Sequence, residues 1–124
     1  MDSSNRIDKG KEAEQKAALF LKEKGLHLLQ SNYRCHYGEI DLIMKDKDHI
    51  VFVEVRFRHR TDYGNALESI NKNKINKLIK TAPHFLQAKK WLYTVNSRFD
   101  IVTIHPAAKE LQLEWLKNAF WVES

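Results

Sequence analysis

The chain has 124 residues, of which 43% are hydrophobic and 30% are charged. This length suits one domain over residues 1–124 that buries its core without metal or disulfide staples, and the composition excludes a disordered tail. The 21 Lys and Arg against 16 Asp and Glu give a formal net charge of +5. A basic balance of this kind is typical of nucleic-acid binders, although it can also serve solubility alone.

No apolar run approaches the roughly 20 residues that a membrane span needs. The first residues do not have the pattern of a signal peptide, and the single cysteine, Cys35, excludes an internal disulfide. We therefore expect no membrane partner and a cytoplasmic location, with residues 1–9 flexible.

Along the chain, Ala13, Ala17 and Leu21 have helical spacing and predict a helix over residues 10–24 that Gly25 ends. The elements expected after it are a strand (26–35), the two strands of a hairpin (38–45 and 49–58), a loop (61–65), a second helix (66–87) and a strand (92–104).

Two segments carry further expectations. Pro83 should kink or restart the second helix, because proline cannot donate its backbone hydrogen bond. The stretch from Glu110 to Trp121 can be a strand or a short helix, and its alternating apolar residues favour the strand. The order of helices and strands predicts an α/β fold with helices packed on a sheet.

The hairpin is the most informative segment. A two-residue turn at 47–48 would align the apolar residues of its two strands on one face, which we expect to meet the core. These pairs are Met44–Val51, Leu42–Val53 and Ile40–Val55. On the opposite face Asp41 would lie across from Glu54, although a shift of two residues would preserve the same alternation.

Two opposed carboxylates on an apolar hairpin are destabilising unless something compensates for their charge. A divalent cation would do so, since Mg²⁺ binds one or two carboxylates together with water and phosphate oxygens. Arg56, two residues after Glu54, would point into the same site. The alternatives are a simple ion pair between Glu39 and Arg56, and a solvated sheet edge that holds both Asp41 and Glu54.

Basic residues follow the hairpin and are the candidates for contacts with a nucleic-acid backbone. They are Arg56, Arg58, Arg60, Lys74 and Lys77. The plainer interpretation of this run is a solvated basic face. The six histidines are scattered, and Cys35 and His36 stand alone as neighbours, so the sequence predicts no zinc site.

Residues 38–43 (GEIDLI) and 51–58 (VFVEVRFR) closely resemble the signature of the YraN-like family of bacterial proteins. That family is related to archaeal Holliday-junction resolvases of the PD-(D/E)XK nuclease superfamily. The resemblance covers nearly the whole chain. The other matching motifs are the helix over 10–25 with Glu14, Asn32-Tyr33-Arg34, Tyr63-Gly64, Lys74 with Leu78 and Ala82, and Arg98-Phe99-Asp100.

The resemblance implies a restriction-endonuclease-like fold, with a central mixed sheet flanked by helices. It implies a metal-dependent endonuclease that uses Mg²⁺ or Mn²⁺ on DNA, in particular branched or structured DNA. It also implies a homodimer, because resolvase relatives cut two strands symmetrically.

Site residues follow from the same resemblance. Asp41 and Glu54 would bind the metal with the backbone carbonyl of Val55, and Glu14 would reach the site from the first helix. Arg56 stands where the family has lysine. Arginine stays protonated, so Arg56 can stabilise charge but cannot act as a base.

Three hypotheses remain open at this stage. The first is the endonuclease, with Glu14, Asp41, Glu54 and Arg56 as catalytic residues. The second is a nuclease-fold module that binds nucleic acid without cutting it, which the arginine at position 56 favours. The third is a protein-interaction domain.

Overall fold

The computed structural model describes the chain except for residues 1, 59–69, 108–109 and 121–124. Its elements are α1 (Asp2–Glu23), β1 (His27–Cys35), β2 (Gly38–Asp46), β3 (His49–Phe57), α2 (Lys72–Ala88), β4 (Asn96–Ala107) and β5 (Glu110–Phe120). The five strands form one sheet in the order β1-β2-β3-β4-β5. Strands β3 and β4 are parallel and the other neighbours are antiparallel. This mixed sheet with two helices is an α/β fold, consistent with the predicted restriction-endonuclease-like arrangement.

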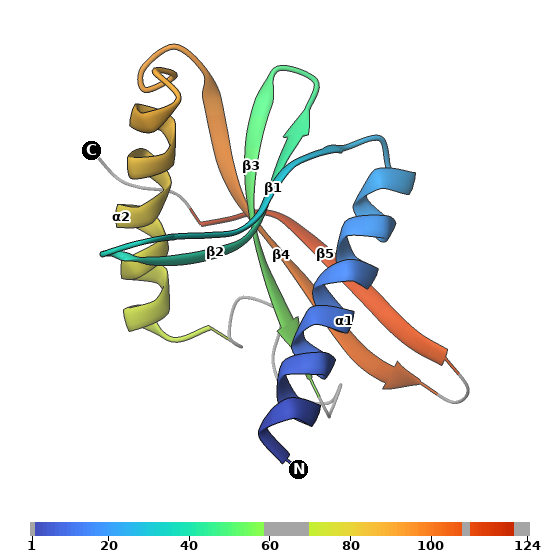
Figure 1. Cartoon of the computed structure of the whole chain (residues 1–124). Helices are drawn as coiled ribbons and strands as arrows, with labels where there is room; N and C mark the ends of the chain where they lie inside the picture. The colour runs from blue at the N-terminus through green and yellow to red at the C-terminus, as the bar shows by residue number, and fades with distance from the viewer. Residues whose placement is uncertain (1, 59–69, 108–109, 121–124) are drawn as a thin grey trace.

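The two helices cover opposite faces of the sheet (Figure 1). Helix α1 buries Ala13, Ala17 and Leu21 against β2, β3 and β4, as its spacing predicts. Helix α2 buries Leu78 and Phe85 against the other face, over the cluster that contains Phe52. Burial of both faces explains why the central strands are almost continuously apolar. No helix among the described residues is long and apolar enough to cross a membrane.

The hairpin register agrees with the prediction where the strands pair. Leu42 lies opposite Val53 and Met44 opposite Val51, around a turn in which Lys47 has a φ of 57°. The pairing ends at Leu42 and Val53, so the expected contact of Ile40 with Val55 is wrong. Ile40 packs on the α2 side of the sheet, because β2 leaves β3 at this point and stays paired only with β1.

The element boundaries depart from the prediction in several places. Helix α1 begins at Asp2, eight residues before the predicted start at Gly10; the flexibility of residues 1–9 stays a prediction. Helix α2 begins at Lys72, later than predicted, where Asn71 accepts a hydrogen bond from the N–H of Lys74. It runs through Pro83 as one helix and does not restart there.

In the second half, β4 begins at Asn96, four residues after the predicted start at Leu92. The tail forms a strand, β5, as favoured. The predicted loop over residues 61–65 lies outside the described residues.

The turn between β1 and β2 packs directly against α2. Gly38 has a φ of 155°, which few other residues adopt, and a Cβ atom at this position would lie 3.2 Å from Lys77 Cβ and from Thr81 Oγ1. A side chain here would be both strained in its backbone and tightly packed against α2, so Gly38 favours the close approach of this turn to the helix.

Candidate metal and phosphate site

Four acidic side chains gather where β2 and β3 diverge. Carboxylate oxygens of Glu14, Glu39 and Asp41 lie within 4.8 Å of one another. Asp41 in turn adjoins Glu54, since its Oδ2 accepts a hydrogen bond of 2.8 Å from the backbone N–H of the next residue, Val55. Helix α1 and strands β2 and β3 therefore each contribute to one acidic cluster.

An irregularity shared by β1 and β2 turns these side chains toward α1. The pairing of the two strands passes from Ser31–Leu42 to Tyr33–Ile40 and skips the residues between. Asn32, one of those two residues, has a φ of 52°, a left-handed conformation that asparagine tolerates better than most residues. The other skipped residue is Asp41. The site thus lies at a local break in the β1–β2 ladder, which also has a register shift between Leu28 and Gln30.

The carboxylate of Asp41 takes a place that backbone pairing would otherwise fill. Beyond Leu42 and Val53 the two strands no longer exchange hydrogen bonds, and the N–H of Val55 donates to Asp41 instead. This bond satisfies a strand donor and holds the carboxylate, which is only 9% exposed, beside β3. Val55 therefore contributes its N–H here, and the predicted metal contact through its carbonyl stays a prediction.

Glu54 is the most unusual ionisable group at the site. It is 3% exposed, and its Oε1 has no hydrogen-bond partner in the described part of the chain. Burial, followed by the charge of Asp41, raises the pKa of Glu54 to about 8, although Lys74 and Arg56 act in the opposite direction. A buried carboxylate with an unpartnered oxygen is costly, so a ligand at this atom would relieve a standing penalty.

Two cations flank Glu54 from different elements. Lys74 Nζ on α2 lies 3.5 Å from Glu54 Oε2, and Arg56 Nη1 on β3 lies 4.0 Å from the same oxygen. Lys74 was predicted only as a contact with nucleic acid, because residues 58–71 separate its helix from β3 and sequence spacing alone cannot place it beside Glu54. The structure therefore brings a lysine from α2 to Glu54, although the position two residues after Glu54 holds arginine.

Glu14 reaches the cluster from α1 and is held by Asn32, whose Nδ2 donates to Glu14 Oε1 at 2.9 Å. Partial burial raises the pKa of Glu14, and the nearby charges of Asp41 and Glu39 add to the effect, whereas the Asn32 hydrogen bond opposes it. A surface pocket of about 470 Å³ adjoins these two side chains and also touches Lys11. The acidic cluster is accordingly open to solvent on its α1 side.

Both plain alternatives for the acidic residues are wrong. Glu39 makes its ion pair with Arg34, not with Arg56, because β2 continues alongside β1 after leaving β3. A solvated sheet edge is excluded for Glu54 and Asp41 by their burial. Glu39 is the acidic residue whose place in the cluster the sequence did not predict, although its position two residues before Asp41 is the pattern that could have indicated it.

The other predicted contacts with nucleic acid are only partly brought together. Lys77 is exposed and lies one turn after Lys74 on α2. The backbone N–H of Arg58 donates to the carbonyl of Ile104 at 2.7 Å, which extends the β3–β4 edge. Arg60 lies outside the described residues, as does the Tyr63-Gly64 motif.

The chain matches the profile of a family described as "Uncharacterised protein family UPF0102" over residues 13–104. This span contains the four acidic residues, both flanking cations and Asn32. The motifs in the sequence predicted membership of a poorly characterised bacterial family, and this prediction is confirmed. The relation of the family to nucleases stays a prediction.

Relatives match along nearly their whole length. A UPF0102 protein of Nitrosococcus oceani is 43% identical over 124 residues, which is 100% of both chains. A UPF0102 protein of Nitrosomonas europaea is 47% identical over 117 residues, or 94% of this chain and 97% of the relative. A relative from Legionella pneumophila is 44% identical over 113 residues, covering 91% of this chain and 94% of its own.

Proposed function

This chain belongs to the UPF0102 family, and we propose that it is a metal-dependent endonuclease that hydrolyses phosphodiester bonds of DNA, preferably in branched or structured DNA. The observation that carries the proposal is the buried Glu54 beside Asp41. One of its carboxylate oxygens has no partner within the part of the chain that the structure describes, and two cations lie close by. Such an arrangement is expensive for a fold and has a direct use in phosphate chemistry.

The donor set fits a hard divalent cation. All the converging ligand atoms are carboxylate oxygens, which Mg²⁺ and Mn²⁺ prefer. Asp41 would hold the metal, with Glu14 or Glu39 from one side and Glu54 from the other. When bound, Mg²⁺ or Mn²⁺ supplies an activated water and neutralises charge on the phosphate.

The protein groups have separable roles. Val55 fixes Asp41 through its N–H, and Asn32 fixes Glu14, so both carboxylates are oriented before any ligand arrives. Lys74 and Arg56 would stabilise negative charge on the phosphate as the bond to the leaving oxygen breaks. Lys77 and the net charge of +5 would hold the DNA backbone with little sequence preference and with strong salt dependence.

Cleavage assays with end-labelled DNA test the proposal. Four-way junction, flap, single-stranded and linear duplex DNA would be compared with Mg²⁺, with Mn²⁺ and with EDTA. We expect metal-dependent cutting by the wild type, with the junction or flap cut fastest, and loss of cutting in Asp41→Asn and Glu54→Gln. The matched control is Glu12→Gln, which changes an exposed acid on the same helix as Glu14 and should cut normally.

Equal cutting by Glu54→Gln and the wild type would overturn the assignment, since the activity would then come from elsewhere or from a contaminating nuclease.

The proposed homodimer would supply two sites for symmetric cuts. Its mass can be measured by analytical ultracentrifugation of the same sample.

A second candidate is a DNA-binding module of the same fold without catalysis. Arg56 favours it, because a guanidinium cannot accept a proton. Lys74, 3.5 Å from Glu54, weighs against it by supplying an ammonium group to the same carboxylate. Salt-sensitive binding of the four DNAs with no cutting under any metal would favour the module.

A further inference from the structure

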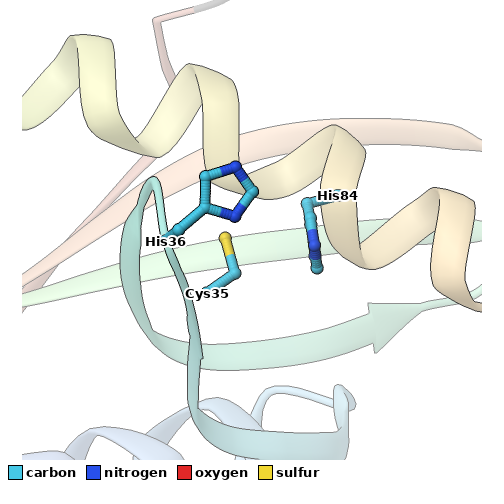
Figure 2. Close-up of side chains that lie close together, drawn as sticks. All are labelled: Cys35, His36 and His84. Carbon is cyan, nitrogen blue, oxygen red and sulfur yellow. The ribbon is translucent and has the colours of Figure 1, made fainter.

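A second group of ligating side chains lies at the other end of β2 from the hairpin turn. Cys35 ends β1, His36 follows it in the turn, and His84 comes from α2. One donor atom from each lies within 4.8 Å of the other two, and the sulfur of Cys35 points toward the two imidazole rings (Figure 2). The sequence-based expectation that Cys35 and His36 stand alone is therefore wrong.

The fold explains why His84 was missed. Gly38 lets the β1–β2 turn pack against Lys77 and Thr81 on α2. His84 follows Thr81 by three residues, so it lies on the same face of the helix and extends along the turn. A contact between a turn and a helix that follows much later in the chain leaves no spacing pattern in the sequence.

Neighbouring groups already orient two of the three donors. Tyr33 Oη and His84 Nδ1 are hydrogen-bonded at 2.5 Å, which leaves Nε2 as the nitrogen of His84 that is available to a metal. The backbone N–H of Tyr37 donates to Cys35 Sγ at 3.4 Å and would support negative charge on the sulfur. Hydrogen bonds to the remaining atoms of metal ligands are the usual way in which proteins fix ligand geometry.

Aromatic packing holds the same side chains. Tyr33 packs edge to face on Phe85 at 5.2 Å between ring centroids, which fixes the group that orients His84. The rings of His36 and Tyr37 lie 4.0 Å apart, and those of His36 and His84 lie 5.8 Å apart. Tetrahedral coordination requires the donor atoms to lie about 1 Å closer together than 4.8 Å. Because His36 is exposed, its ring can rotate to bring them together.

We propose that Cys35, His36 and His84 bind Zn²⁺, with water in the fourth position, and that this ion ties the β1–β2 turn to α2. Thiolate and imidazole ligands favour zinc over magnesium, whereas the carboxylates of the acidic cluster favour magnesium. The two sites therefore differ in chemistry, and the zinc site does not depend on nuclease activity.

The test uses the full chain without an affinity tag, with a phosphine reductant and with Mg²⁺ in excess to occupy the carboxylates. Zn²⁺ is titrated in competition with a chromophoric chelator, and Co²⁺ is added separately as a spectroscopic probe. We expect one tight equivalent of Zn²⁺ and a sulfur-to-cobalt charge-transfer band with tetrahedral cobalt absorption. Cys35→Ser should lose that band, and His84→Gln should weaken Zn²⁺ binding about 100-fold or more.

Two further variants separate metal binding from structural damage. Tyr33→Phe keeps the ring that packs on Phe85 but removes the hydroxyl at His84, and should weaken Zn²⁺ binding about 10- to 100-fold. His27→Gln changes an exposed histidine on the same strand, outside the cluster, and should bind Zn²⁺ as the wild type does.

The proposal is overturned if the wild type shows no sulfur-to-cobalt band, or if Cys35→Ser and His84→Gln bind Zn²⁺ as tightly as the wild type. Asp41→Asn, which changes the acidic cluster, should bind Zn²⁺ as the wild type does. The Zn²⁺ titration therefore tests the zinc site alone, and the cleavage assay tests the nuclease proposal alone.

Discussion

Two buried carboxylates on neighbouring strands differ in how many hydrogen-bond donors surround them. Asp100 on β4 is 1% exposed and is fully partnered: it accepts hydrogen bonds from Arg98 Nε, Trp115 Nε1 and the N–H of Asn118. Glu54 on β3 is 3% exposed, and one of its oxygens has no hydrogen-bond partner among the described residues. The two strands pair in parallel, so this contrast arises within a single region of the sheet.

The difference separates a structural carboxylate from a candidate functional one. At Asp100 three donors, one of them the Arg98 guanidinium that forms the ion pair, compensate for desolvation. Arg98 also binds Asp46 at 2.9 Å. This contact lowers the pKa of Asp46. At Glu54 the cost of desolvating the carboxylate is not compensated to the same degree, and the pKa of Glu54 is raised. Burial alone therefore says little about function, whereas burial without partners indicates a place for a ligand.

The largest effect on stability should come from removing the structural carboxylate, Asp100. Asp100→Ala leaves Trp115 Nε1 and the N–H of Asn118 without their acceptor and leaves Arg98 with Asp46 alone. It should lower the free energy of unfolding by about 3–5 kcal/mol. Urea unfolding at pH 7 measures the loss. Asp100→Asn keeps the shape and one acceptor and should lose less; a loss below about 1 kcal/mol for Asp100→Ala would contradict this role.

The next largest effect is the pH dependence of stability that Glu54 should cause. The pKa of Glu54 rises from 4.5 to about 8 on folding, so between these values the folded chain holds a proton that the unfolded chain has released. Stability should consequently fall as pH rises through this window, by up to ~1.4 kcal/mol per pH unit. Glu54→Gln should remove this part of the slope. Urea unfolding of both chains from pH 5 to 8 measures it, and parallel profiles would show that Glu54 does not titrate as described.

A smaller effect is expected at Asn32, which shapes the open side of the site. Its φ of 52° is accessible to glycine but costs most other residues about 1–2 kcal/mol. Asn32→Ala should thus be less stable than Asn32→Gly by roughly that amount in thermal or urea unfolding, although both lose the hydrogen bond to Glu14. Equal stability of the two variants would mean that the backbone there relaxes.

The smallest effect should come from Lys74, whose charge lowers the pKa of Glu54. Lys74→Met should raise that pKa further, by about one unit, and extend the falling part of the stability profile to higher pH. Lys77→Met removes an exposed charge one turn away and is the matched control. If both variants move the profile equally, the effect belongs to overall charge and not to the 3.5 Å contact with Glu54.

Local pattern predicted much of this architecture. Alternation in the hairpin fixed the pairing of Leu42 with Val53, because a slip of one residue would have exposed an apolar face. The same alternation failed at Ile40, since it carries no signal for where a ladder stops. Glu14 entered the prediction through resemblance alone, and spacing on α1 gave no reason to place it near Asp41.

Contacts between distant elements were beyond the reach of periodicity. The contact of Lys74 with Glu54 and the approach of His84 to Cys35 both depend on how α2 packs on the sheet. Neither contact is visible as a pattern in the local sequence. The Glu54 oxygen that lacks a partner in the described ranges is likewise a property of three-dimensional packing. Sequence supplied the residue types, and the arrangement of helix against sheet decided which of them meet.

The close packing at Gly38 has a consequence for how the two sites could evolve. Gly38 favours the close approach of the β1–β2 turn to helix α2. A side chain at position 38 would need Lys77 and Thr81 on α2 to give way by a few tenths of an ångström, on the helix that carries both Lys74 and His84. A substitution of this one glycine therefore bears on the helix that serves the acidic cluster and the Cys35 cluster together.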